Sequence, residues 1–426
     1  MNYLTKILVA LIGVQCCAGA EKLPDPPKLP AVLVKNHEAI SPEIMRATHD
    51  FRDRLLADPY RPAFHFALPE GIGIPGDPNG AYYKDGVYHL MFLYNQSGRR
   101  PDANADGASF AWGHVSSSDL LHWRYHPDAL VPGDGDDGAF SGGAFVDDDG
   151  TAVLSYWMLW GAKGIGLATS QDGETWKKSP ANPVIKSTEW GITEMTDASG
   201  KAIHVGSADP SNIWKKAGKY YMLTGNLMVL EKYGRKADSS ADERGDRLYL
   251  FESADLKTWK YKHRFYESKR EWTEASEDNM CPSFLPLPVS ADGGKASGKY
   301  LLLAISHNRG ARYYVGDYRN DHFYPDLHGR MSWKDNALFA PEALMDKQGR
   351  QIMWSWIFDD RPEQAQKDSG WTGMYSLPRT LWLAQDGTLG IRPAKELESL
   401  RLSSQERTTS TSKPAKILRC QDSEAN

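Results

Sequence analysis

The sequence predicts an all-β protein, a five-bladed β-propeller preceded by a short helical extension. Segments typical of short strands dominate the chain, and strands do not alternate with long amphipathic helices. Aromatic residues are abundant, with 14 Trp, 20 Tyr and 13 Phe in 426 residues, which favours a β architecture. Two series of similar segments also recur at nearly equal intervals, and such recurrence indicates a repeated structural unit.

The overall composition excludes several classes of protein. Hydrophobic residues make up 41% of the chain and charged residues 25%, so a disordered or collagen-like chain is excluded. The 50 basic and 55 acidic side chains give a net charge of −5, which offers no electrostatic surface for nucleic acid. The 12 His show no zinc-protease spacing, so the sequence implies no metal or other cofactor. Nothing in the sequence specifies an oligomeric state.

The first 20 residues are typical of a secretory signal peptide. Lys6 supplies the positive charge, and residues 7–14 form an apolar run that is too short to span a bilayer. Residues 18–20 (AGA) form a small-residue cleavage site. Cleavage after Ala20 predicts a secreted or periplasmic protein that has no membrane segment once the signal is removed.

Residues 21–60 are predicted to form a tether followed by one helix. The tether is Pro-rich over residues 21–30, Ser41 can cap the helix, and Pro42 suits its first turn. We expect the propeller to occupy residues 61–400. Residues 401–426 are rich in Ser, Thr and other polar residues, which is typical of a disordered tail.

Seven short runs are rich in β-branched, aromatic and aliphatic residues, and most are bounded by Gly, Asp, Asn or Ser. These runs are predicted to be strands: residues 87–95, 152–159, 219–226, 247–253, 299–306, 311–318 and 351–357.

Two repeats define the predicted blades. In the first, a Ser lies six residues before a Trp with a turn between them, at Ser117/Trp123, Ser170/Trp176 and Ser253/Trp259. The second consists of small or Pro-containing turns 59 to 72 residues apart: Asp77-Pro78, Ser141-Gly142, Asp209-Pro210, Cys281-Pro282 and Ala340-Pro341. Five units of about four strands each predict a five-bladed propeller, and the near-equal spacing favours it over the alternative, a pair of β-sandwiches.

In a propeller, the first strand of each blade lines the central channel, so residues at the start of these strands converge. Carboxylates far apart in sequence can then lie close together and raise one another's pKa, which allows one to act as an acid and another as a base. Several of the repeated turns carry or adjoin acidic residues, so we expect the functional site at this end of the channel.

The motifs follow the order of a known family. They include RPAFHF at residues 61–66, GDPNG at 76–80, YYKDGVYHL at 82–90, WGH at 112–114, FSGGA at 140–144, DP at 209–210, CPSFLPL at 281–287, FAP at 339–341, SLPR at 376–379 and RP at 392–393. This series resembles glycoside hydrolase family 32, the β-fructofuranosidases, which include invertases, inulinases and levanases.

The resemblance implies a retaining hydrolase that works through two carboxylates. Asp77 matches the family's nucleophile, and Asp209 matches the Asp that stabilises the transition state by bonding sugar hydroxyls. The expected substrate is a fructoside of the sucrose, inulin or levan type. The matched motifs also imply substrate-binding residues, namely Asn79, Trp112, Phe140 and Ser141.

The general acid/base is where the sequence departs from the family pattern. The family has Glu immediately before Cys-Pro, and this chain has Met280, whose thioether cannot donate a proton. Glu277 is the first candidate to replace it because it has the right residue type. Asp278 is the alternative because it shares the parity of Met280 in an extended segment, and an acid from elsewhere, such as Glu342, is a third possibility.

Further departures concern the substrate and the domain content. Ala208 stands where the family has Arg before Asp-Pro, residues 74–76 (IPG) replace its usual Trp-Met-Asn, and the family's C-terminal β-sandwich is replaced by the polar tail. The sequence therefore predicts a secreted β-fructofuranosidase-like enzyme. Two alternatives stay open: a propeller that binds carbohydrate without cleaving it, and a glycosidase acting on another furanoside, as in the related family 43.

Overall fold

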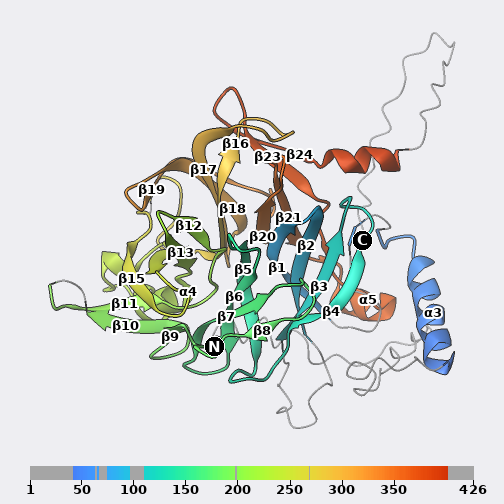
Figure 1. The fold of residues 1–426 in the computed structure, drawn as a ribbon, viewed down its shortest axis with the longest axis horizontal. Coiled ribbons are helices and arrows are strands. Elements are labelled where there is room, and N and C mark those ends of the chain that lie inside the picture. Colours follow the sequence, from blue (N-terminus) through green and yellow to red (C-terminus); the bar gives the residue numbers. More distant parts are fainter. Residues whose placement is uncertain are drawn as a thin grey trace, which may run out of the picture.

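The computed structural model describes residues 42–62, 65–66, 74–95, 110–196, 199–267 and 269–401. The predicted signal peptide, the tether and nearly all of the predicted tail lie outside these residues. Five antiparallel sheets follow one another along the chain and surround a common centre (Figure 1), which confirms the predicted five-bladed propeller.

Each of the five sheets contains four strands in sequential order, with small additions. The first two are β1 (Ile74–Lys84), β2 (Val87–Asn95), β3 (Phe110–Ser117) and β4 (Arg124–Leu130), then β5 (Gly138–Val146), β6 (Ala152–Leu159), β7 (Gly164–Ser170), β8 (Lys177–Lys178) and the additional β9 (Ile185–Lys186). The third is β12 (Trp214–Lys216), β13 (Lys219–Thr224), β14 (Tyr249–Ser253) and β15 (Trp259–Arg264). The last two are β16 (Met280–Pro288), β17 (Ala296–Ser306), β18 (Gly310–Arg319) and β19 (His322–Arg330), then β20 (Leu338–Met345), β21 (Gln351–Ile357), β23 (Arg379–Leu383), β24 (Leu389–Pro393) and the additional β22 (Met374–Tyr375).

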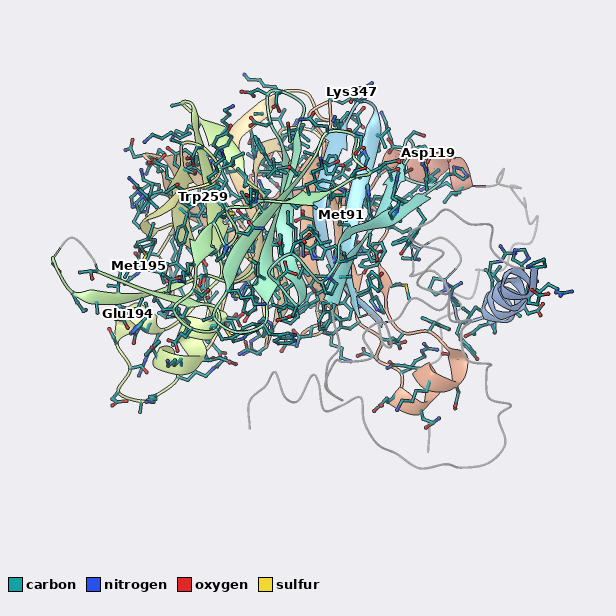
Figure 2. The ribbon with its side chains drawn as sticks, turned by 60° about the horizontal axis from the view of Figure 1, so that its bottom comes forward. Met91, Asp119, Glu194, Met195, Trp259 and Lys347 are labelled. Carbon is teal, nitrogen blue, oxygen red and sulfur yellow. The ribbon has the colours of Figure 1, made fainter. Side chains whose placement is uncertain are left out.

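The remaining elements lie between or beside the blades. In the described residues the helices are α3 (Pro42–Leu56), α4 (Leu227–Val229), the π-helical turn η1 (Leu230–Gly234), η2 (Ala241–Glu243), α5 (Glu363–Ser369) and η3 (Lys395–Leu400). A separate hairpin, β10 (Ile192–Thr196) with β11 (Ala202–Gly206), extends from the body at Glu194 and Met195 (Figure 2). No helix of the described residues is both long and apolar enough to cross a membrane.

All seven runs predicted as strands are strands in the structure. Three of them, β2, β6 and β21, have the predicted bounds, and the other four differ by one to three residues at an end. The strand β6 is buried at every position because neighbouring blades cover both of its faces. That is why it appears in the sequence as a continuous apolar run rather than as an alternating one.

The Ser-to-Trp repeat forms the turn between the third and fourth strands of the first three blades. In the third blade, Ser253 donates a hydrogen bond to Asp255, whose carboxylate accepts the backbone N–H groups of Lys257 and Thr258. Asp119 and Asp172 hold the corresponding turns in the same way. The repeat is therefore a local device in which a carboxylate satisfies the backbone of a tight turn.

The second repeat forms a β-bulge in the innermost strand of the blades. The pairing register shifts between Pro75 and Pro78 in β1, between Ala139 and Gly142 in β5, and at corresponding points of β16 and β20. In the third blade, Ala208 forms an isolated bridge with Gly225, and regular pairing resumes at β12. A bulge bends the strand and redirects its side chains, so these positions are suited to building a site.

The core of the described residues consists of five hydrophobic clusters. Four of them lie between two neighbouring blades, and the fifth lies between the second and third blades and also reaches β16, β17 and β20. Trp112 and Tyr156 occupy the cluster between the first two blades, and Trp354 lies in the cluster that joins the fifth blade to the first. The ring closes at that last interface, where the Glu342 carboxylate in β20 accepts a hydrogen bond from the backbone N–H of Ala81 in β1.

The predicted N-terminal helix is present as α3 and lies at the edge of the molecule (Figure 1). It begins at Pro42, which suits the first turn as the sequence predicts. The segment after it is held by Asp58, which accepts a hydrogen bond of 2.8 Å from the indole N–H of Trp371.

Candidate active site

Four of the five repeated turns bring their side chains together. Asp77 comes from the first blade, Ser141 from the second, Asp209 from the start of the third and Cys281 from the fourth. Ser141 Oγ donates a hydrogen bond of 2.5 Å to Asp77 Oδ2, and Cys281 Sγ lies 3.4 Å from Asp77 Oδ2 and 3.4 Å from Asp209 Oδ2. We call these four residues the axial cluster.

The shared thiol fixes how close the two carboxylates are. Because Cys281 Sγ touches one oxygen of each, those two oxygens are separated by no more than twice the 3.4 Å contact distance. Asp209 and Cys281 both have left-handed backbones, with φ of 40° and 48°. Such strain in non-glycine residues costs about 1–3 kcal/mol each and is concentrated at functional sites.

Burial and mutual repulsion control the charges in the axial cluster. Burial raises the pKa of Asp77, and hydrogen bonds from Ser141 and Cys281 oppose this rise. Burial and the charge of Asp77 raise the pKa of Asp209 to about 7. Near neutral pH, Asp209 is therefore partly protonated, and the hydrogen bonds from Ser141 and Cys281 favour the charged form of Asp77.

Glu277, the first predicted acid/base, is held outside the axial cluster. Its Oε2 lies 2.7 Å from Arg312 Nη1 in an ion pair whose two side chains are 5% and 1% exposed, and its Oε1 accepts the backbone N–H of Glu274. None of its described contacts involves Asp77 or Asp209. The geometry therefore favours a structural position for Glu277 and leaves its predicted role without support.

Asp278, the alternative acid/base, lies close enough to the axial cluster for its charge to act on Asp209. Its carboxylate accepts hydrogen bonds from His307 Nδ1 at 2.8 Å, from the His307 backbone N–H at 2.9 Å and from Ser306 Oγ at 3.3 Å. Burial would raise the pKa of Asp278, but the charge and hydrogen bonds of His307 outweigh burial and lower it. The negative charge of Asp278 also adds to the rise in the pKa of Asp209, so the two carboxylates are electrostatically coupled.

Neither Met280, which occupies the position of the family's acid, nor Glu342, the third candidate, contacts the axial cluster through a described hydrogen bond. Met280 is buried, and its Sδ accepts the backbone N–H of Leu227 at 3.4 Å, so its side chain packs against α4. Burial raises the pKa of Glu342 to about 8, but its carboxyl group is hydrogen bonded to the backbone of β1 across the closing interface.

The four predicted substrate-binding residues differ in their surroundings. Ser141 donates a hydrogen bond to Asp77. Asn79 braces the first two blades, because its amide donates to the Asp77 carbonyl and accepts from the Gly142 backbone N–H. Trp112 is fully buried with its indole N–H on the Phe140 carbonyl, so the structure does not support the prediction that its ring stacks on a sugar. Phe140 is partly exposed and contacts Trp157, Trp160 and Trp190, so it remains available to a ligand.

The sequence interpretation missed the thiol of Cys281 and the imidazole of His307. Cys281 could have been found, because it occupies the same place in the repeat as Asp77, Ser141 and Asp209. His307 carries no such signal, because it lies just beyond β17 and reaches the site only through the pairing of β17 with β16.

Comparison with known proteins establishes the family of the chain. Residues 65–393 match the N-terminal domain of the glycosyl hydrolases family 32, and they cover most of the chain. The chain belongs to this family. Among curated family 32 relatives, a levanase of Bacillus subtilis is 29% identical over 84% of this chain, and a raffinose invertase of Escherichia coli is 29% identical over 80%.

Solved family 32 structures share the fold. A fructan 1-exohydrolase of Cichorium intybus superposes with a TM-score of 0.62 at 24% identity, covering 81% of this chain and 63% of the other. A β-fructofuranosidase of Bombyx mori, solved as a mutant with sucrose, gives a TM-score of 0.60 at 23% identity, covering 86% of this chain and 72% of the other. The chain spans only 50% of the levanase and 66% of the invertase.

Proposed function

We propose that this protein is a secreted glycoside hydrolase that cleaves β-fructofuranosidic bonds in sucrose or fructans and retains the anomeric configuration. The observation that carries this proposal is the contact of Asp77 and Asp209, through Cys281, in a family 32 domain. The names of the relatives support the same substrate class, since they include a levanase, a raffinose invertase and β-fructofuranosidases.

Asp77 is the proposed nucleophile. Its carboxylate attacks the anomeric carbon of the fructosyl unit, the glycosidic bond breaks, and a covalent fructosyl-enzyme forms. The hydrogen bonds from Ser141 and Cys281 favour the ionised form that this attack requires.

Asp209 is the proposed stabiliser of the transition state. Its pKa of about 7 keeps part of the population protonated at neutral pH, so its carboxyl group can donate a hydrogen bond to a sugar hydroxyl as well as accept one. The proton for the leaving group must then come from elsewhere, and among the sequence candidates the geometry favours the segment at Asp278.

The experiment is fructose release by the mature protein from sucrose, inulin and levan, with Asp77→Asn as the control. We expect release from at least one substrate, and we expect the nearly isosteric variant to lose it while its melting temperature stays unchanged. Equal release by both proteins would refute the nucleophile assignment.

A second candidate function follows from Met280, which stands where the family places its acid. If no carboxyl group or other donor replaces that acid, the propeller binds fructosides without cleaving them. Calorimetric binding of inulin or levan without any fructose release would favour this candidate.

Export is a separate part of the proposal and depends on residues 1–20 alone. Expression of the full chain in a secreting host, followed by N-terminal sequencing of the exported protein, tests it. Glu21 at the new N-terminus is expected, and an unprocessed intracellular product would contradict it.

A further inference from the structure

We propose that His307, positioned by Asp278, is the group that donates and recovers the proton during fructoside cleavage. This inference rests on the proposed function, because it supplies the acid that the sequence lacks at Met280.

The position of His307 follows from strand pairing. Met280 pairs with Ile305 across β16 and β17, so the residues that precede Met280 lie beside those that follow Ile305. Asp278 thereby meets His307 through two hydrogen bonds, one to the ring and one to the backbone. The ring also contacts Phe339 in β20 with centroids 5.7 Å apart, so it lies beside the bulge of the fifth blade.

Asp278 and His307 differ in solvent exposure. The Asp278 side chain is 0% exposed and both of its oxygens accept hydrogen bonds, so it cannot reach a substrate. The His307 side chain is 23% exposed. An ionised carboxylate can only accept, so Nδ1 of His307 carries a proton towards Asp278, and no described residue forms a hydrogen bond with Nε2. Nε2 is therefore the atom available to a ligand.

The groups facing His307 favour its protonated form. Asp278 holds the ring, and the charges of Asp77 and Asp209 reach it from the first and third blades. Glu231 in η1 faces it as well, because the charge of His307 lowers the pKa of that carboxyl group. Burial lowers the pKa of His307, but the negative charges outweigh burial and raise it above its ordinary value. Arg312 is the nearby cation, and it pairs with Glu277 and with the Asp278 carbonyl.

The proposed steps balance in protons and electrons. As Asp77 forms its bond to the anomeric carbon, the glycosidic bond breaks and its electron pair goes to the leaving oxygen, which takes the proton from Nε2. His307 is then neutral. In the second step water attacks the anomeric carbon, Nε2 takes a proton from that water, and the electron pair of the ester bond returns to Asp77.

The test compares two substrates that differ in the leaving group: sucrose, which needs a proton, and an aryl β-fructofuranoside with an acidic phenol, which does not. We expect His307→Gln to lower kcat/KM on sucrose by about 10²- to 10⁴-fold, and on the aryl substrate by much less. In the wild type, we expect activity to fall at alkaline pH because His307 loses its proton. This fall should therefore disappear in His307→Gln.

Asp278→Asn serves as the second variant and tests the positioning role. Removing its charge lowers the pKa of His307, so the alkaline fall in activity should move to lower pH. This shift is measurable even if His307→Gln does not fold, and a structural role for Asp278 alone would not produce it.

Glu231→Gln is the matched control, because Glu231 is a carboxyl group that faces His307 and whose pKa burial raises. At pH values below the alkaline fall, where His307 stays protonated, we expect this variant to affect both substrates to a similar extent. The inference is overturned if Glu231→Gln, and not His307→Gln, loses activity selectively on sucrose. It is also overturned if the activity of His307→Gln still falls at alkaline pH as in the wild type. A wild type that releases fructose from neither substrate refutes the proposed function itself, which separates the two failures.

Discussion

The Cys281 thiol lies 3.4 Å from one oxygen of each of two carboxylates that come from different blades, so its single proton can be donated to either of them. Burial and the two neighbouring charges raise the pKa of the thiol well above its ordinary value, so it stays protonated and acts as a donor. The thiol lowers the pKa of Asp77 and of Asp209, opposing the effect of burial on both. A single side chain thus influences the ionisation of both proposed catalytic carboxylates.

Removing the thiol should therefore shift the pH dependence of activity. In Cys281→Ala, the pKa values of Asp77 and Asp209 rise, so the acidic limb of kcat/KM should move to higher pH. The shift should be no more than about one pH unit because S–H is a weak donor. Cys281→Ser restores a donor and should reverse the shift, and an acidic limb that is identical in all three proteins would contradict the assignment.

Glu277 is expected to stabilise the fold rather than to take part in catalysis. Glu277→Gln removes the carboxylate that is hydrogen bonded to the buried Arg312 and should lower the free energy of unfolding by about 3 kcal/mol. Glu274→Gln is the matched control, because the Glu274 side chain is 62% exposed in its pair with Arg309, and this pair should contribute less than about 1 kcal/mol.

Urea denaturation measures both changes, and kinetics add a second readout. We expect Glu277→Gln to affect sucrose and an aryl fructoside equally. Selective loss on sucrose would restore Glu277 as the proton donor.

At the scale of single elements, the inner-strand bulges place the functional groups, and they require close backbone contacts. Gly142 in β5 follows Ser141, and its backbone N–H bonds to Asn79. A Cβ atom on Gly142 would overlap the carbonyl oxygen of Ser155 in β6. The glycine is therefore required by the approach of two strands and not by its own φ.

Gly142→Ala should accordingly separate β5 from β6 and disturb Ser141. We expect a loss of more than about 3 kcal/mol in the free energy of unfolding, together with a marked loss of activity. Gly150→Ala is the control, because Gly150 lies in an open turn with φ of 82°, where a side chain meets strain of about 1–2 kcal/mol but no clash. Chemical denaturation of both variants tests this, and equal losses would argue against a steric requirement in β5.

At the scale of the whole molecule, the first blade contains three stacked histidines, of which His114 and His126 are buried and His89 is partly buried. His89, His114 and His126 stack in the first blade, with His89 Nδ1 2.9 Å from His114 Nε2. Burial lowers the pKa of all three, and that of His89 falls to about 4. These histidines are neutral in the folded protein at neutral pH.

Acidification should therefore destabilise the fold before most carboxylates titrate. Between about pH 6.5 and pH 4 the unfolded chain binds more protons than the folded one, so stability falls as pH decreases through this window. We expect a loss of a few kcal/mol, because each unit by which burial lowers the pKa of a histidine such as His89 corresponds to about 1.4 kcal/mol. Urea midpoints at pH 7, 5.5 and 4.5 measure it. His114→Gln should flatten the dependence, and His122→Gln, in an exposed turn of the same blade, should leave it unchanged.

Local sequence signals determined much of this protein. Apolar runs such as residues 152–159 fixed the strands, the Asp-capped turns at Asp172 and Asp255 fixed their connections, and the repeat spacing fixed the number of blades. The equivalence of Asp77 and Asp209 within that repeat was also sufficient to predict that the two would meet, because corresponding residues of a propeller converge on its axis.

Only the tertiary structure decided the environment of each group. Glu277 and Asp278 are neighbours in the sequence, yet one is paired with Arg312 in β18 and the other with His307 beyond β17. Burial of Trp112, donation by Cys281 and exposure of His307 likewise depend on which strands pack together. Electrostatics and desolvation act between atoms within a few ångströms, and those neighbours come from distant parts of the chain, so no local pattern encodes them.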